Sequence, residues 1–126
     1  SAFFEAFAPY ASRYPFQIDI YPKRHSDDFF GVTEEEVRDL AKMFRKIFEV
    51  FYSKLGDIPL NIVLDTTPFN LEGPGFEKFK YMNLFYHYHI QIIPRINKYG
   101  GIECGLGLNV NPIAPEKAIY ILNGEE

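Results

Sequence analysis

Two histidines separated by one residue are the part of this sequence best suited to chemistry. They stand in the run His87-Tyr88-His89-Ile90-Gln91. Side chains alternate along a β-strand, so His87, His89 and Gln91 are expected on one face. Two neighbouring imidazoles can share a metal ion, or one can attack phosphorus while the other orients it. Gln91 can hydrogen-bond to a phosphate or to a ring nitrogen. The run therefore predicts a site on one face of a strand.

A metal shared by this pair needs a third ligand, and the sequence offers Asp65. This residue ends the apolar run 60–65, which is expected to form a neighbouring strand. Two imidazoles and a carboxylate suit zinc or iron(II). An aspartate at a strand end is also an ordinary turn residue, so this alternative stays open.

Basic residues flank the histidine run and could neutralise a phosphate. Arg95 can bind a phosphate in bidentate fashion, and Lys78, Lys80 and Lys98 lie nearby in the sequence. Each of them could equally be a solubility charge. The glycines of 100–107 match neither a phosphate-binding loop nor a dinucleotide fingerprint, because no helix with the right glycine spacing follows them.

The remaining histidine and the single cysteine are expected to be structural. His25 follows Pro22-Lys23-Arg24 at the end of a strand, and Cys104 is expected to be a small buried hydrophobe. One cysteine cannot form an internal disulfide, which agrees with a reducing cytoplasm.

The composition bounds the class of protein. The chain has 126 residues, 47% of them hydrophobic and 17% aromatic, which suits one globular domain with a substantial core. The net charge of −4 disfavours a non-specific nucleic-acid binder. No apolar run reaches the length of about 20 residues that a membrane span needs. The sequence opens without Met in an apolar run and closes soon after an expected helix begins, so we expect a piece of a longer protein.

Hydrophobic periodicity predicts an α+β domain. Thr33 and Glu36 form a capping box, and the apolar residues that follow at spacings of three and four predict one long helix that ends before Gly56. The helix is expected to pack on an antiparallel sheet. The expected strands are 16–21, 60–65, 86–93 and 102–110, with a loop over 66–80 and a helix that begins at Pro115.

The histidine run resembles that of the histidine-triad proteins, with Gln91 in the third histidine's place, as in the galactose-1-phosphate uridylyltransferase branch. The order of further blocks is similar to the C-terminal half of that family and covers nearly the whole chain. These blocks are Pro9-Tyr10-Ala11-Ser12-Arg13-Tyr14-Pro15-Phe16, Pro22-Lys23-Arg24-His25, Thr66-Thr67-Pro68-Phe69-Asn70, Ile92-Ile93-Pro94-Arg95, Gly100-Gly101-Ile102-Glu103-Cys104-Gly105, Asn109-Val110-Asn111-Pro112 and Pro115-Glu116.

The resemblance implies a histidine-triad-like domain over residues 1–126, the C-terminal half of a two-half transferase of galactose metabolism. The whole enzyme would take a nucleotide sugar and a hexose 1-phosphate, and it would act as a cytoplasmic homodimer formed through the full-length protein. His87 and His89 would be the metal pair, with Asp65 where the family has a third histidine. Substrate contacts would come from Arg95 and from the stretch after the histidine strand, at Ile102, Glu103, Cys104 and Leu106. Isolated, the chain would bind without turnover.

Two alternatives remain open. His89 can itself be the nucleophile, with Gln91 beside it, in a free-standing nucleotidyl hydrolase or transferase, because His-x-His-x-Gln also matches the family's catalytic half. The chain can also be a dimerisation module without a ligand.

Overall fold

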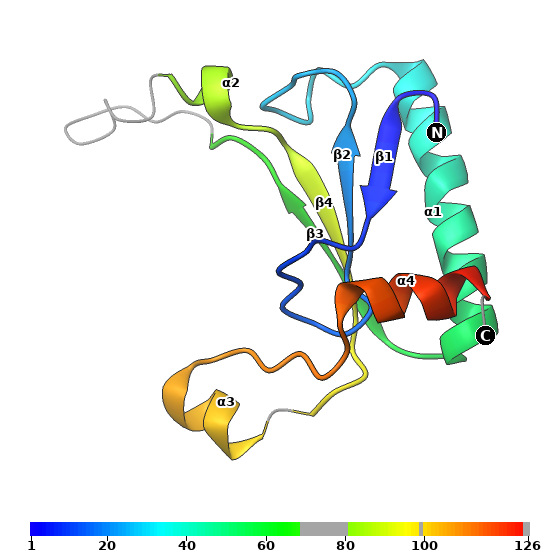
Figure 1. Ribbon diagram of the computed structural model, residues 1–126. Coiled ribbons are helices and arrows are strands. Elements are labelled where there is room, and N and C mark those ends of the chain that lie inside the picture. The colour runs from blue at the N-terminus through cyan, green and yellow to red at the C-terminus, as the bar shows by residue number, and fades with distance from the viewer. Residues whose placement is uncertain (69–80, 99, 125–126) are drawn as a thin grey trace.

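The computed structural model describes residues 1–68, 81–98 and 100–124. A four-stranded antiparallel sheet has the order β1-β2-β4-β3, and the long helix α1 packs on one of its faces (Figure 1). The strands are β1 (Phe4–Phe7), β2 (Ile18–Pro22), β3 (Leu60–Asp65) and β4 (His89–Pro94); the helices are α1 (Glu34–Leu55), α2 (Met82–Phe85), α3 (Gly101–Leu106) and α4 (Pro115–Asn123). The α+β prediction is confirmed. No helix in the described ranges combines the length and the apolarity that crossing a bilayer requires.

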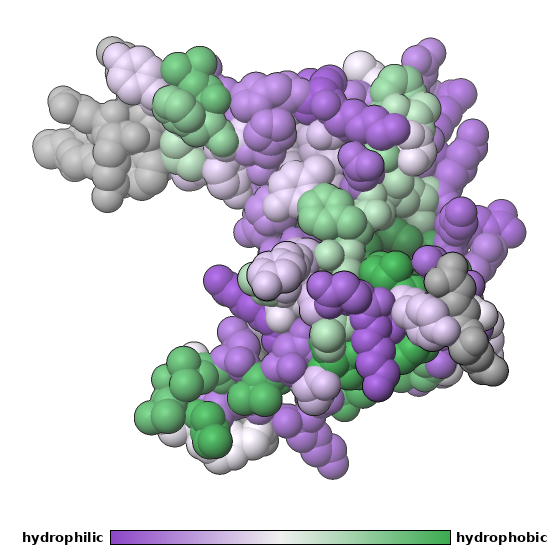
Figure 2. Space-filling view, in the orientation of Figure 1, coloured by the Kyte–Doolittle hydropathy of each residue, from purple (hydrophilic) through white to green (hydrophobic). Residues whose placement is uncertain are grey.

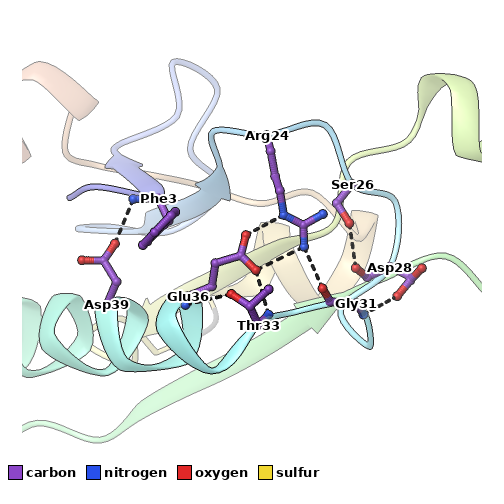
Figure 3. Close-up of polar contacts among 8 residues, drawn as sticks. All are labelled: Phe3, Arg24, Ser26, Asp28, Gly31, Thr33, Glu36 and Asp39. Atoms are coloured by element: carbon purple, nitrogen blue, oxygen red, sulfur yellow. Dashed lines mark hydrogen bonds and ion pairs between the residues drawn. The ribbon is translucent and has the colours of Figure 1, made fainter.

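The start of α1 is held by the predicted capping box. The Thr33 hydroxyl accepts from the Glu36 backbone N–H at 3.2 Å, and the Glu36 carboxylate accepts from the Thr33 N–H at 2.8 Å. Arg24 donates to the same carboxylate at 2.5 Å, and it also donates to the Gly31 carbonyl (Figure 3). Arg24 therefore ties the segment after β2 to the helix N-terminus. At the other end, Gly56 follows the helix with a φ of 82°, a conformation that suits glycine.

Alternation along the strands separates a buried face from an open one. Cross-strand register places Ile18 beside Ile92 and Ile20 beside Ile90, on the face that α1 covers. Leu40 and Phe51 of α1 complete this core together with Phe4, Tyr88, Ala118 and Leu122. The residues between them, Asp19 and Gln91, are paired in register on the opposite face. The fold therefore presents the polar positions of β2 and β4 on the side away from α1.

The prediction of a strand over 102–110 is wrong. Residues 101–106 form the helix α3, and residues 107–114 that follow contain no strand. The Glu103 carboxylate accepts from the Gly100 N–H at 2.7 Å and from the Val110 N–H at 3.2 Å. One side chain thus closes this segment on itself, and Gly107, with a φ of 65°, ends the helix. Apolar residues spaced by glycines were misread as a bent strand.

The other element boundaries differ by a few residues. The expected strand 86–93 begins only at His89, because the helix α2 ends just before it, at Phe85. The strand β1 was not predicted. The expected strand 16–21 begins at Ile18, since Phe16 adopts a φ of 58°. Strand 60–65 and the helix at 115 are confirmed. Thr66 to Pro68 lack regular structure as predicted, while the rest of the expected loop up to residue 80, with Lys78 and Lys80, lies outside the described residues.

Candidate functional site

The side of the sheet away from α1 is the candidate site. Among the described residues no helix covers β2 and β4 there, and the surface is hollowed between α2 and α3 (Figures 1 and 2). Tyr88 and Ile90 are buried on the core side, while His87 and His89 alternate with them and are partly exposed. This pattern agrees with the period-2 prediction for the histidine run.

His89 is fixed from three sides. Its Nε2 lies 3.3 Å from the Asp65 Oδ2, across the β3–β4 ladder where the two residues are register partners. Its Nδ1 lies 3.3 Å from the His87 carbonyl oxygen. The Tyr21 ring stacks on the imidazole at 4.9 Å with only 4° between the planes, and Phe7 stacks on the outer side of Tyr21. The imidazole of His89 is therefore held by an acid, a carbonyl and a ring face.

A buried acid lies on the same face. Asp19 is 5% exposed and accepts a hydrogen bond from the Gln17 amide at 2.8 Å. Burial raises the pKa of the Asp19 carboxyl, and the bond from Gln17 and the nearby His89 act in the lowering direction. Gln91 is its register partner on β4. Sequence reasoning missed Asp19, although its alternation with Ile18 and Ile20 already placed it on the face of Gln91.

His87 lies with a partner that the sequence did not suggest. The His25 Nδ1 is 2.5 Å from the His87 Nε2, and the two rings meet edge to face at 4.2 Å between centroids. The His25 Nε2 lies 2.8 Å from the Asn83 carbonyl oxygen in α2. The two residues are 62 positions apart in the chain, which is why the expectation of a histidine without chemistry overlooked this contact.

The donor groups of the predicted metal set fall into two pairs. His87 faces His25, whereas His89 faces Asp65. Within the described ranges no three His, Cys, Asp or Glu side chains gather into a group that could hold a metal ion. Two ligands are half of a tetrahedral zinc shell. The arrangement does not fit the complete site that was predicted, and we derive no chemical step through a metal.

The predicted substrate-binding residues lie elsewhere, on and before α3. Arg95 follows β4 and lines one small hollow together with Glu103, of about 20 Å³, which has room for little more than water. Ile102 and Leu106 are 61% and 70% exposed on α3. Cys104 is exposed as well, so the prediction of a small buried hydrophobe is wrong. The cause is the change of secondary structure, since a short helix projecting from the fold buries little.

The sheet with its long helix, and the histidine run that leads into β4, define the class of fold. The fold is that of the histidine-triad-like proteins. A zinc-bound histidine triad family protein from Mycobacterium smegmatis superimposes with a TM-score of 0.57 at 17% identity, over 98% of this chain and 78% of the other. At that identity the likeness concerns the fold alone. No family model matches the sequence.

More similar proteins come from the nucleotidyltransferase branch. The chain is 30% identical to ADP-glucose phosphorylase of Arabidopsis thaliana over 122 residues, 97% of this chain and 33% of the relative. It is 29% identical to galactose-1-phosphate uridylyltransferase of Thermotoga maritima over 131 residues, 98% of this chain and 38% of the relative. The crystal structure of the Arabidopsis enzyme with bound ADP-glucose superimposes with a TM-score of 0.87 at 29% identity, over 100% of this chain and 39% of the other.

These relatives confirm the resemblance to galactose-1-phosphate uridylyltransferases. The chain spans about a third of the length of the curated relatives it matches.

Proposed function

We propose that residues 1–126 are one domain, the C-terminal half, of a nucleotidyltransferase that moves a nucleotidyl group between a nucleotide sugar and a hexose 1-phosphate. The observation that carries the proposal is the superposition of the whole chain on a structure with bound ADP-glucose, at a TM-score of 0.87. In the reaction, a histidine nitrogen attacks the α-phosphorus and the hexose phosphate leaves. A second hexose phosphate then attacks the same phosphorus and releases the histidine. We place that nucleophile in the other half of the protein.

In this proposal the open face of the sheet positions groups and does not attack. His89 is held between Asp65 and the His87 carbonyl, so an oxygen faces each of its ring nitrogens. A neutral imidazole has one N–H and one lone pair, and a nucleophile must offer that lone pair to phosphorus. The Asp65 carboxylate lies in front of Nε2, where the phosphorus would have to approach. This contact supports a positioning role for His89.

Substrate contacts are proposed for Gln91, on the open face, and for Arg95 with α3. Gln91 can donate to an oxygen of the ligand, and Arg95 can pair with a phosphate. Ile102, Glu103, Cys104 and Leu106 of α3 would contribute the sugar side. The full-length enzyme is proposed to be a cytoplasmic homodimer that acts in galactose metabolism. The binding assay below determines which hexose and which nucleotide base it takes.

The test uses the 126-residue chain with UDP-glucose, ADP-glucose and galactose 1-phosphate. We expect calorimetry to detect binding of a nucleotide sugar, and we expect phosphorus NMR to detect no exchange of the nucleotidyl group. Arg95→Ala should weaken binding, whereas Arg38→Ala, the same change at an exposed position of α1 on the other side of the sheet, should not. Sustained exchange by this chain would contradict the assignment of the nucleophile to another half.

The second candidate function makes His89 the nucleophile of a free-standing enzyme. It is favoured by one contact, since the His87 carbonyl oxygen near Nδ1 is the kind of acceptor that fixes a histidine tautomer. Incubation with a nucleotide sugar followed by mass spectrometry would then find a nucleotidyl group on His89. An unmodified peptide after incubation, with binding intact, excludes this candidate.

Whether the chain binds zinc or iron is a question for metal analysis. The predicted ligands were His87, His89 and Asp65, and the structure brings His25 to His87 instead. Metal analysis of the purified chain, of His25→Ala and of His89→Ala separates these sets. If both His25→Ala and His89→Ala lost the bound metal, the two histidine pairs would have to rearrange into one site. If neither variant lost it, these histidines would have no role in binding metal.

A further inference from the structure

We infer that a hollow between α1, α4 and β1 binds a single-chain amphiphile with an anionic head, of the kind that a fatty-acid carboxylate represents. The hollow measures about 550 Å³ and lies on the side of the sheet that α1 covers, away from the candidate site. Figure 2 shows hydrophobic surface between α1 and α4, with hydrophilic side chains around it. Sites for small molecules have this size, and most of their lining is apolar with a few polar groups.

The floor of the hollow is part of the hydrophobic core. Phe4 of β1, Phe51 of α1 and Leu122 of α4 line it, and they are 1%, 2% and 8% exposed. Further apolar side chains of α1 and α4 continue this lining, namely Met43, Ile47, Val50 and Ile119. An alkyl chain that lies on this floor exchanges contact with water for contact with packed apolar side chains. The floor therefore supplies the driving force for the apolar part of a ligand.

Two cations at the rim of the hollow are unpaired. Lys42 and Lys46 lie one turn apart on α1, and both line the hollow. Neither forms an ion pair within the described part of the chain, whereas the third lysine, Lys23, donates to the Ser1 carbonyl. Like charges at this helical spacing repel one another, and an anion between them relieves the repulsion. This lysine pair beside an apolar floor favours an anionic head group, in a chain whose net charge is −4.

Two acids also line the hollow, and both are directed elsewhere. The Asp39 carboxylate accepts a hydrogen bond from the Phe3 backbone N–H at 2.9 Å. Glu5 alternates along β1 with the buried Phe4, so its carboxylate is expected on the opposite face of the sheet. The lysine pair on α1 therefore remains available to the head group of a ligand.

The part of α1 that borders the hollow has the length of a medium alkyl chain. At a rise of about 1.5 Å per residue, the helix advances about 13 Å from Lys42 to Phe51. A stretched chain of about ten carbon atoms has a similar length. We therefore expect decanoate to fit, with its carboxylate at the lysine pair and its chain along the floor.

The test titrates the 126-residue chain with octanoate, decanoate and dodecanoate, each below the concentration at which it forms micelles, and measures binding by calorimetry. We expect saturable binding of one molecule per chain that tightens about fourfold with each added methylene group. Decyltrimethylammonium has the same chain length and the opposite charge, so it should bind at least tenfold more weakly than decanoate. Binding that is insensitive to chain length, or equal for the anion and the cation, overturns the inference.

Substitutions at the rim separate this site from general adsorption. Lys42→Ala and Lys46→Ala should each weaken decanoate binding about threefold, because each removes one of the two charges at the head group. Lys117→Ala, the same change at an exposed position of α4 outside the hollow, should leave the affinity unchanged. All three lysines are exposed, so the fold should be retained, which circular dichroism verifies. Equal affinity in the wild type and both rim variants contradicts the assignment.

The same titration on the longer protein, which carries the other half, tests whether the hollow stays open. We expect decanoate to bind with the affinity measured for the 126-residue chain, because the hollow and the candidate site lie on opposite faces of the sheet. Loss of binding in the longer protein would show that the other half covers the hollow, and this would overturn the inference as well.

Discussion

Replacing Glu36 with glutamine should destabilise the fold in a way that depends on pH. The carboxylate is buried, with 4% of the side chain exposed, and it accepts hydrogen bonds from the Arg24 guanidinium and from the Thr33 backbone. These bonds, the one from Arg24 first, lower the pKa of Glu36 from 4.5 to about 2. The ionised form is therefore stabilised in the folded state.

The size of the effect follows from this difference in pKa. A shift from 4.5 to about 2 corresponds to about 3 kcal/mol of stability at neutral pH. Arg24 is 44% exposed, and solvent screens its half of the pair, so we expect about 1–2 kcal/mol to be lost in Glu36→Gln. For a domain of this size that loss lowers the melting temperature by roughly 3–10 °C.

The sign of the pH dependence can be checked directly. The folded-state pKa lies below the unfolded value, so the contribution is present above pH 4.5 and is lost as the pH falls toward 2. At a pH of about 2.5 only about a quarter of it remains. Urea unfolding followed by circular dichroism should thus find a large difference between wild type and Glu36→Gln at pH 7 and a small one at low pH. Equal differences at the two pH values would refute the reasoning.

Glu34, two residues before Glu36 on the same helix, is a matched control because it has the same kind of ion pair without the burial. Glu34 also pairs with an arginine, Arg38, yet its side chain is 79% exposed. Exposed ion pairs contribute little, so Glu34→Gln should be indistinguishable from wild type. If both variants lost the same stability, the cause would be general helix electrostatics and not the buried network with Arg24.

Three further outcomes are expected. Tyr88→Phe should match or slightly exceed wild-type stability in thermal unfolding, since the buried Tyr88 hydroxyl makes no hydrogen bond within the described residues and burial raises its pKa to about 12. Cys104 should react with a thiol reagent in the native protein as fast as after unfolding, because it is exposed, and slow labelling would contradict this. Asp65→Asn should shift the ring NMR signals of His89 at a fixed pH while leaving those of His87 in place, because the two rings have different partners. A common change in both rings would indicate one joint site.

Local signals predicted the long helix and one strand almost to the residue. The capping pair Thr33 and Glu36, the apolar stripe and Gly56 mark both ends of α1, and each acts within a few residues of the position it controls. Strand 60–65 likewise has its stated bounds. These elements were predictable because the interactions that define them are local.

The failures have a different origin. In the glycine-rich stretch, the bonds from Gly100 and Val110 to Glu103 form a helix where apolar spacing suggested a strand. Phe16 adopts a positive φ, so β2 begins two residues later than predicted, at Ile18. Nothing in the sequence signals this, because phenylalanine is a residue that favours strands. His25 meets His87 across 62 residues of sequence. No local pattern reports a contact of that kind, so the candidate site was predicted as one cluster where the structure has two pairs.

The acids around His89 decide how this face can meet a phosphate. Asp65 faces the His89 ring there, and its carboxylate would repel a phosphate brought to that ring, while the buried Asp19 lies on the same face. A site in which a histidine attacks phosphorus would be expected to carry cations beside that histidine, to stabilise the negative charge of the transition state. Arg95 and Lys98, which follow the end of β4, are the described cations of the predicted phosphate-binding set. Under the proposed function, the phosphate is therefore expected beside Arg95, beyond the end of β4, and the Asp65–His89 pair is expected to hold β3 and β4 in register.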